Sequence, residues 1–273
     1  MRRFRSSSID IRREFFAVVT VVGFVLSSVC LGYSGGLGEP NDPYHISDVN
    51  DLMALAGDVN DYNKCFILAA DIDLDPNLPG NQIFTAAVIA PDNIRGRNHL
   101  FQGTSFTGYF NGNNFRILNL TIDTNSLSRD YLGLFGRTDA NAIIVDLGLE
   151  NTAITGGDDP YYLGGLVAYN YRGNITNCYV EGYVNPGSES RHLGGLVGYN
   201  NEGNITDCYV TGDVMAGISS RYLGGLVGTD IKGSINNCYA IVSLAGASSI
   251  GGLVGYSVEC SIINCYAAGS LLG

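Results

Sequence analysis

One stretch of 17 residues occurs four times toward the C-terminal end of the chain. It reads LGGLVGYNNEGNITDCY from Leu193 to Tyr209, and related stretches begin at Leu163, Leu223 and Ile250. The cysteines near the end of each copy follow one another after 30, 30 and 27 residues. A nearly constant period of this length indicates that one small structural unit stacks on copies of itself.

The composition of this unit predicts strands. It is rich in β-branched, aromatic, Gly and Asn residues, and its apolar residues do not recur at the helical spacing of three and four. A strand rises about 3.3 Å per residue and neighbouring strands lie about 4.8 Å apart, so one repeat divided into short strands can complete one turn of a coil. The sequence therefore predicts an all-β fold, a parallel β-helix.

The column of the cysteines extends backwards through two weaker copies of the repeat. YLGLFG from Tyr131 and VDLGLEN from Val145 place Leu147 in this column, and FNGNNFRILNLTI from Phe110 places Leu120 there. The sequence thus predicts a β-solenoid of about six coils. Its predicted inward ladder of apolar side chains is Leu120, Leu147, Cys178, Cys208, Cys238 and Cys265.

We expect the cysteines of this ladder to be free thiols that are buried and pack as small apolar side chains. A disulfide between neighbouring coils is the alternative, because Cα atoms about 4.8 Å apart lie within disulfide range. Parallel pairing in register directs the Cβ atoms side by side, which would strain such a bond.

Residues 1–32 have the composition of a secretory signal peptide. Five arginines precede an apolar stretch from Phe15 to Leu26, and this stretch is short for a transmembrane helix. The pair Arg12 and Arg13 leaves a twin-arginine route as an alternative to general secretion. We therefore expect an exported chain, secreted or held at the cell surface, that has no membrane span after the signal is removed.

The charge balance limits the kinds of partner. Removal of residues 1–32 takes away five Arg, one Asp and one Glu, which leaves 24 acidic against 10 basic residues. An acidic chain of this kind is not expected to bind nucleic acid. A glycan or a surface protein remains as the expected class of partner, and the charge itself identifies no ligand.

Residues 33–60 are expected to form a linker and an N-terminal cap. The start of this segment, YSGGLGEPNDP, is rich in turn residues and predicts an exposed linker. Ser47 is expected to cap a short helix that ends near Ala56 and covers the open end of the first coil. Residues 61–273 then form the β-helix, with the clear repeats over 163–273. The chain stops in the middle of a repeat, which suggests a truncated C-terminus or an end that meets a partner.

An aromatic stripe is the main candidate binding surface. One tyrosine follows each cysteine of the ladder and should point outward from the coil. The four residues are Tyr179, Tyr209, Tyr239 and Tyr266. These rings either stack on one another for structural reasons or offer a contact surface to carbohydrate or protein.

Three aspartates are weak candidates for a calcium site. Asp71, Asp73 and Asp75 alternate along ADIDLDPN, as oxygen ligands of calcium do in known loops. The same alternation fits a half-buried strand whose aspartates face solvent. No cofactor is expected, and no other metal site is predicted.

Signs of catalysis in the sequence are weak. β-helical enzymes that cleave acidic polysaccharides use paired carboxylates, and Gly157-Asp158-Asp159 matches one element of such a pattern. Its companion elements are missing, and the motif falls in the variable turn between repeats. The three histidines, His45, His99 and His192, are scattered and expected at the surface. A polysaccharide lyase or hydrolase is therefore an alternative rather than the main prediction, which is a chain that is not an enzyme.

The repeated segments GGLVAYN, GGLVGYN, GGLVGTD and GGLVGYS resemble the GLUG-motif family of bacterial exported proteins. The resemblance extends from Phe106 to the C-terminus, and FILAADIDL resembles the usual entry into such arrays. It implies a right-handed β-helix in a secreted or surface protein, and in relatives the array accompanies adhesins and immunoglobulin A peptidases. The zinc motif of those peptidases is absent here, so the resemblance carries over only the non-catalytic array.

These observations together predict an exported, non-catalytic β-solenoid that acts as an adhesion or scaffold module at the cell surface. An accessory binding domain of a larger surface enzyme is the alternative.

Overall fold

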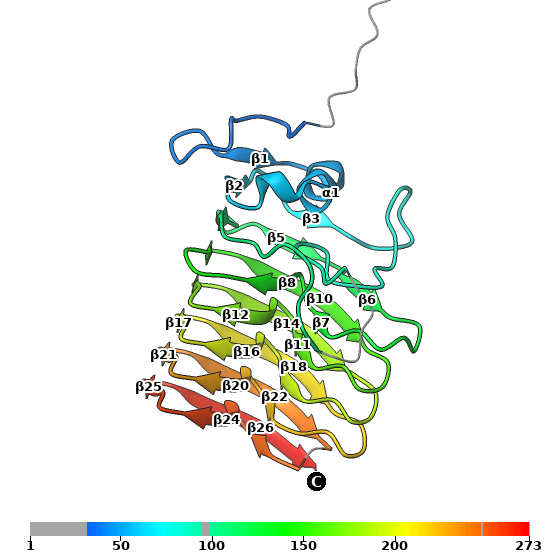
Figure 1. Ribbon diagram of the computed structural model, residues 1–273, viewed down its shortest axis with the longest axis vertical. Helices are drawn as coiled ribbons and strands as arrows, with labels where there is room; N and C mark the ends of the chain where they lie inside the picture. The colour runs from blue at the N-terminus through cyan, green and yellow to red at the C-terminus, as the bar shows by residue number, and fades with distance from the viewer. Residues whose placement is uncertain (1–31, 94–98, 247, 273) are drawn as a thin grey trace, which may run out of the picture. The chain divides into compact units, whose positions relative to one another are not determined.

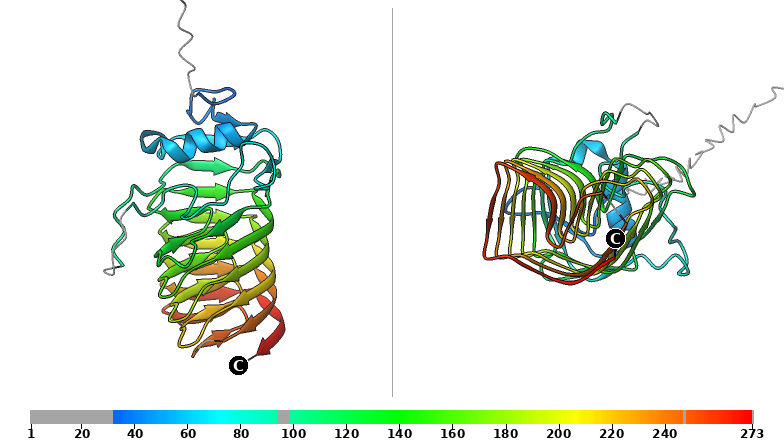
Figure 2. Two further views of the ribbon diagram at one scale, coloured as in Figure 1. Left: turned by 90° about the vertical axis from the view of Figure 1, so that its right-hand side faces the viewer. Right: turned by 90° about the horizontal axis from the view of Figure 1, so that it is seen from below.

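The computed structural model describes residues 32–93, 99–246 and 248–272, which form a parallel β-solenoid (Figure 1). Seen along its axis in Figure 2, the successive coils lie over one another. The predicted fold class is therefore confirmed. The signal peptide predicted over residues 1–32 falls, except for Gly32, outside the described residues.

Five complete coils contain four strands each. They are β7 (Tyr131–Leu132), β8 (Phe135–Thr138), β9 (Ile143–Val145) and β10 (Gly148–Thr155); β11 (Tyr162–Gly164), β12 (Val167–Tyr171), β13 (Asn174–Thr176) and β14 (Tyr179–Asn185); β15 (His192–Gly194), β16 (Val197–Asn201), β17 (Asn204–Thr206) and β18 (Tyr209–Met215); β19 (Leu223–Gly224), β20 (Val227–Ile231), β21 (Ser234–Asn236) and β22 (Tyr239–Ala245); β23 (Ile250–Gly251), β24 (Val254–Val258), β25 (Ser261–Ile263) and β26 (Tyr266–Leu272).

The N-terminal part is less regular. Its elements are β1 (Tyr44–Ile46), α1 (Val49–Gly57), the 3₁₀ helix η1 (Val59–Asp61), β2 (Cys65–Leu68), β3 (Ile72–Asp73), β4 (Tyr109–Asn111), β5 (Arg116–Leu118) and β6 (Thr121–Asp123). These strands extend two of the four sheets, because β1, β2 and β4 continue the stack of β9 while β3, β5 and β6 continue that of β10.

The strands of the coils form four sheets. Sheet 1 has the order β1-β2-β4-β9-β13-β17-β21-β25, and sheet 2 has the order β3-β5-β10-β14-β18-β22-β26 with β6 also paired to β10. Sheet 3 has the order β7-β11-β15-β19-β23, and sheet 4 has the order β8-β12-β16-β20-β24. The predicted count of about six coils thus corresponds to five complete coils and partial ones before them, because the N-terminal strands complete only two walls.

Helix α1 caps the N-terminal end of the core, as Figure 1 shows. Leu52 and Leu55 of α1 are fully buried and belong to the same apolar cluster as the strands. The N-cap residue is Asp48, whose side chain accepts a hydrogen bond from the backbone N–H of Asp51. The prediction of Ser47 as the cap was wrong by one residue, because the Asp48 carboxylate is the group that accepts the hydrogen bond from a free N–H of the first helical turn.

The segment before β1 is exposed over much of its length, as its turn residues predict, but it is anchored at its start. The ring of Tyr33 stacks on Tyr44 at 4.1 Å between centroids, and its hydroxyl donates to Asp61 at 2.9 Å. Phe66 contacts both tyrosine rings. The segment is therefore held by aromatic packing, which the abundance of Gly and Pro did not reveal.

The inward ladder is formed by five of the six predicted residues. Leu147, Cys178, Cys208 and Cys238 are at most 1% exposed, and Cys265 in the last coil packs against the core while remaining partly exposed. Each buried cysteine Sγ lies near backbone carbonyls, and Cys178, Cys208, Cys238 and Cys265 are all free.

Leu120 is fully buried but belongs to another column, so its predicted place was wrong. Arg116 pairs with Gly148 and Thr121 pairs with Ala153, which puts Phe115 at the level of Leu147 and Leu120 at the level of Thr152. The turn at Asn113 and Asn114, which both have positive φ, places four residues between Asn111 and Arg116 where the next coil has two, and Leu120 lies five residues beyond Phe115.

A second ladder, made of polar side chains, runs through sheet 4 inside the wall. The Thr138 hydroxyl donates to Asn170 at 2.7 Å, the Asn170 amide donates to Asn200 at 2.7 Å, and the Asn200 amide donates to Asp230 at 2.8 Å. The amides of Asn170 and Asn200 also donate to the carbonyls of Gly173 and Gly203, three residues further on. Each buried amide is thereby satisfied from within its own coil and from the next one.

Asp230 ends this ladder with one oxygen unsatisfied. Its side chain is fully buried, and Oδ2 has no hydrogen-bond partner. Burial raises the pKa of Asp230 above its ordinary value. The carboxyl therefore stands where the repeat places an amide, and folding makes its ionised form less favourable than it is in the unfolded chain.

We expect Asp230→Asn to raise the free energy of unfolding at neutral pH by about 1–3 kcal/mol, because an amide can donate where Oδ2 has no partner.

The pKa of Asp230 is higher in the folded than in the unfolded state. The free energy of unfolding of the parent should therefore fall as pH rises from about 4 through the folded-state pKa. Urea unfolding at a series of pH values measures both effects. Asp213→Asn, at an exposed position, is the control and should change stability by less than about 0.5 kcal/mol. An Asp230→Asn variant less stable than the parent would contradict this account.

We expect Cys208→Ala to lower the free energy of unfolding by about 1–2 kcal/mol through lost packing, with or without reductant. Cys65, Cys178, Cys208, Cys238, Cys260 and Cys265 are all free, so denatured and unreduced chain that begins after residue 32 should show six reactive thiols. Fewer thiols would indicate a disulfide between coils. In that case the melting temperature of the parent would also fall on reduction.

Candidate binding surfaces

The structure brings the four predicted tyrosines into one outward ladder on sheet 2. Tyr179, Tyr209, Tyr239 and Tyr266 pair in register on β14, β18, β22 and β26. Successive ring centroids are 4.8, 4.9 and 5.1 Å apart, and the ring planes differ by 0°, 1° and 6°. We call this set the tyrosine ladder.

The stacking decides which part of each ring a partner can reach. The faces of Tyr209 and Tyr239 are covered by their neighbours, so these residues present ring edges and hydroxyl groups. Tyr266 lies in the last described coil and is 54% exposed. The ladder is therefore a flat strip of phenolic edges spaced by one strand separation, about 4.8 Å.

A charged network adjoins the first tyrosine of the ladder. Gly148 precedes Tyr179 in the column, and a Cβ atom there would collide with the Tyr179 ring. The Tyr179 hydroxyl donates to Glu150 Oε1 at 2.7 Å, and Glu150 in turn accepts from Arg116 at 3.3 Å. Burial and the hydrogen bond to Glu150 raise the pKa of Tyr179. Its hydroxyl thus remains protonated and fixed in direction at neutral pH.

The three aspartates proposed for calcium have separate partners. Asp71 forms an ion pair of 2.6 Å with Arg116, and the hydrogen bond from Arg116 lowers the pKa of Asp71. Asp73 accepts from the Asn119 amide at 2.7 Å, and Asp75 accepts from the backbone N–H of Asn77 at 2.9 Å. Within the described ranges, no three His, Cys, Asp or Glu side chains are grouped so that they could hold a metal ion. The calcium hypothesis stays a weak prediction.

The motif Gly157-Asp158-Asp159 lies in the turn after β10. Asp158 Oδ1 accepts from the backbone N–H of Ser188 at 2.8 Å, and the backbone N–H of Asp159 donates to the Ser188 carbonyl at 2.8 Å. These contacts tie the turn of one coil to the turn of the next. They account for the motif as a structural element of the turn stack.

A second aromatic surface, which the sequence reasoning missed, lies where sheets 3 and 4 meet. Side chains there enclose a hollow of about 250 Å³. Its lining residues are Tyr161, Arg191, His192, Tyr199, Arg221, Tyr222, Thr229, Ile231 and Tyr256. We call this hollow the aromatic groove. Two positions of the repeat could have indicated it. Tyr recurs directly before the Leu that begins the repeat, as at Tyr162 and Tyr222, and again two residues after the Val of GGLV, as at Tyr199.

His192 is buried in this groove, so the prediction of three surface histidines was wrong for this residue. It is 8% exposed, and its Nδ1 lies 2.7 Å from the Thr229 hydroxyl. Burial, with a smaller effect of Arg191, lowers the pKa of His192 to about 3, so the ring is neutral at physiological pH. His45 is exposed, and His99 lies 3.0 Å from Asp130 through its Nδ1.

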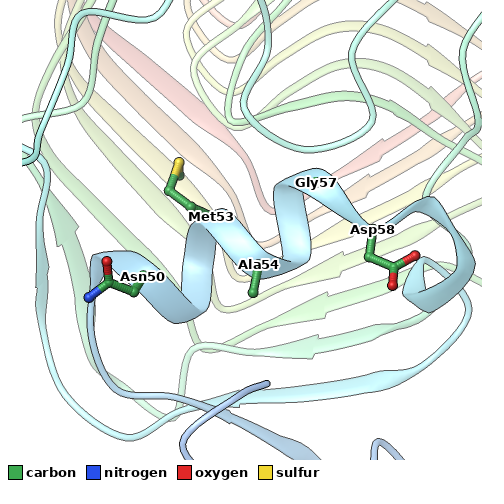
Figure 3. A pocket seen from close by; sticks show the side chains of 5 residues that line it. All are labelled: Asn50, Met53, Ala54, Gly57 and Asp58. Atoms are coloured by element: carbon green, nitrogen blue, oxygen red, sulfur yellow. The ribbon is translucent and has the colours of Figure 1, made fainter. Parts of the chain in front are cut away.

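A larger hollow of about 610 Å³ lies along helix α1, near the N-terminal end of the solenoid (Figure 3). Its lining residues are Asn50, Met53, Ala54, Gly57 and Asp58. Asp58 is the one ionisable residue among them, and its Oδ1 already accepts from the backbone N–H of Asn60 at 3.0 Å. The hollow therefore has volume but few polar groups that could orient a ligand.

Comparison of the sequence with known families and proteins gives one family match and two relatives. The model of the GLUG motif matches residues 159–185, 189–215 and 246–271. Halomucin of Haloquadratum walsbyi is 31% identical over 153 residues, which are 55% of this chain and 2% of halomucin. A protein of Evansella cellulosilytica, provisionally named a Gly-rich membrane protein, is 32% identical over 170 residues, which are 61% of this chain and 17% of that protein. The chain thus spans a small part of these relatives.

One solved structure has a similar fold. It is the crystal structure of a protein from Bacteroides ovatus that is provisionally named an immunoglobulin A1 protease. The TM-score is 0.61 with 23% sequence identity, and the alignment covers 88% of this chain and 70% of the other. At this identity the likeness concerns the fold. In the part of the chain that the structure describes, no helix has the length and apolarity needed to cross a membrane.

Removal of one ring from the middle of the tyrosine ladder should destabilise the fold. We expect Tyr209→Ala to lower the free energy of unfolding by about 1–3 kcal/mol, because Tyr209 stacks on two neighbours. Tyr183→Ala is the matched control, since Tyr183 lies on the same sheet and is 46% exposed. Equal losses for the two variants in urea unfolding would show that the stacking contributes little.

Proposed function

The chain carries GLUG-motif repeats, and from this premise we propose that it is an exported, non-catalytic β-solenoid that acts as an adhesion or scaffold module at the cell surface. The repeats and the solenoid fold support a rigid module whose outer walls repeat at the spacing of the strands. The N-terminal sequence, with its basic and apolar parts, supports export.

The tyrosine ladder is the observation that carries the adhesive role. Its rings stack nearly parallel to one another, and their hydroxyl groups recur once per coil. Tyrosine offers a large apolar edge together with a polar group at a low cost in conformational entropy. A strip of this kind suits an extended partner, a glycan chain or a segment of a surface protein, that can follow several coils.

The arrangement of carboxylates supports a role without catalysis. Hydrolysis of glycosidic bonds needs two carboxyl groups that flank the scissile bond. The aromatic groove has no Asp or Glu among its lining residues, and Asp158 is engaged in the turn stack. Beside the tyrosine ladder, Glu150 is engaged by Tyr179 and Arg116.

A second candidate function is that of an accessory binding domain in a larger surface enzyme. Two observations favour it. The matched segments amount to 2% and 17% of the two relatives, so related arrays occur as parts of much longer chains. The similar fold in a protein provisionally named an immunoglobulin A1 protease is the second observation. In this alternative the same binding surfaces would hold the enzyme near its substrate.

Binding of the purified chain to glycan and matrix-protein arrays tests the adhesive role. For any partner that the parent binds, the double variant Tyr209→Ala, Tyr239→Ala should lower the affinity at least about tenfold. Tyr209→Phe keeps the stack and removes one hydroxyl, so it separates hydrogen bonding from stacking. Circular dichroism of each variant establishes that the coils remain folded.

Tyr183→Ala is again the control and should bind as the parent does. The proposal fails if the double variant, shown to be folded, keeps the affinity of the parent, or if the control loses as much. Absence of binding to every glycan and protein on the arrays would also count against it.

A further inference from the structure

The aromatic groove exists because one residue breaks a column of tyrosines. Tyr169, Tyr199 and Tyr256 occupy the same position in sheet 4 in three coils, and Thr229 occupies it in the coil between Tyr199 and Tyr256. A threonine leaves free the volume that a phenol ring would fill. The hollow of about 250 Å³ lies at this position, bordered by Tyr199 on one side and Tyr256 on the other.

The backbone beside the hollow is strained at Tyr222. This residue has a φ of 47°, in the left-handed region that bulky side chains seldom adopt. Tyr162 and His192, the equivalent residues of the preceding coils, are not among the residues with positive φ. Strain of this kind persists where surrounding structure enforces it and is concentrated at functional sites. At Tyr222 it sets the direction of a ring that lines the groove.

Two arginines line the groove, and within the described residues neither forms an ion pair with a carboxylate. Arg191 and Arg221 occupy equivalent backbone positions in successive coils, since Leu193 pairs with Leu223 two residues further on and the backbone N–H of Arg221 donates to the Ser190 carbonyl at 2.8 Å. Five other cations of the described chain form ion pairs with Asp or Glu: Lys64, Arg116, Arg137, Arg172 and Lys232. Like charges at facing positions repel each other, so an anion between the two guanidinium groups would relieve this repulsion.

The remaining groups of the groove leave the positive charge uncompensated. No Asp or Glu lines the hollow, although the chain has 26 acidic residues. His192 is neutral, and its Nδ1 lies at hydrogen-bond distance from the Thr229 hydroxyl. The guanidinium of Arg191 lies 4.8 Å from the centre of the Tyr161 ring, which holds it in place. An acidic protein thus has a small basic site with aromatic walls.

We propose that the aromatic groove binds an anionic sugar residue, with the ring of the sugar among Tyr199, Tyr222 and Tyr256 and its acidic group on Arg191 and Arg221. The volume suits a group the size of one sugar ring, being slightly below that of sites for drug-sized ligands. Guanidinium groups match the geometry of carboxylates and of sulfate-like anions. Tyrosine walls pack against the apolar side of a sugar ring and bond to its hydroxyls.

Three synthetic probes test this proposal by isothermal titration calorimetry at low ionic strength. They are a trimer of galacturonic acid, a 6-sulfated galactose trimer and a neutral galactose trimer. At least one acidic trimer should bind about tenfold or more tightly than the neutral one, because a hydrogen bond to a charged group contributes about 1.5–3 kcal/mol. The stronger of the two acidic probes identifies the anion as carboxylate or sulfate.

Two variants locate the site. Thr229→Tyr introduces the residue that three other coils have at this position and should fill the hollow, so binding should be lost. Circular dichroism of this variant establishes that the coils remain folded. Arg221→Gln removes one guanidinium and should weaken binding of the acidic trimer about tenfold to a hundredfold. Arg172→Gln is the matched control, because Arg172 lies 4.8 Å from the Tyr171 ring, as Arg191 does from Tyr161, but outside the groove.

The proposal is overturned if the neutral and acidic trimers bind equally, or if none of the three binds to folded parent protein. It is also overturned if Arg172→Gln weakens binding as much as Arg221→Gln, which would indicate general electrostatic attraction. These results are independent of the adhesive role, because the tyrosine ladder lies on sheet 2 and contributes no residue to the groove.

Discussion

Hydrogen bonding in register between neighbouring coils is the constraint on which the rest of the structure depends. Each strand pairs with the equivalent strand one repeat away, so a side chain lies about 4.8 Å from its own copy. The same rule produces three different ladders: cysteines in the core, asparagines inside the wall and tyrosines on the outside. A single coil leaves both sides of every ladder open, and therefore stability is a property of the stack.

Regular columns and irregular columns have different consequences for binding. In the tyrosine ladder each of four successive coils carries a tyrosine. Stacking covers the ring faces between neighbours and leaves a strip of ring edges accessible. In sheet 4, Thr229 interrupts the tyrosines and leaves a hollow in an otherwise filled surface. The regular column thus favours an extended partner, while the interruption favours a small one. Both surfaces arise from one repeat, the ladder from a column without interruption and the groove at the position where Thr229 replaces a tyrosine.

Much of the fold could be predicted because the period of the repeat specifies which residues share a column. The cysteine ladder, its burial and the outward row of tyrosines all follow from alternation along the strands. Prediction was wrong where local chemistry changed the register. In the coil that contains the turn at Asn113 and Asn114, Phe115 rather than Leu120 lies at the level of Leu147, and Asp48 rather than Ser47 bonds the first turn of α1. The calcium-like pattern and the motif Gly157-Asp158-Asp159 were weaker guides, because turns use the same short polar residues.

The sequence by itself determined the contacts within a column, since these join residues separated by one repeat, as Cys178 and Cys208 are. Only the tertiary structure decided which columns face each other. Tyr161, Tyr199 and Tyr222 belong to different columns and different coils, and they meet because the chain turns between sheets 3 and 4. The angle of that turn depends on how side chains of both sheets pack together, and no spacing in the sequence records it. For this reason the tyrosine ladder could be anticipated from the repeat, whereas the aromatic groove and its buried His192 could not.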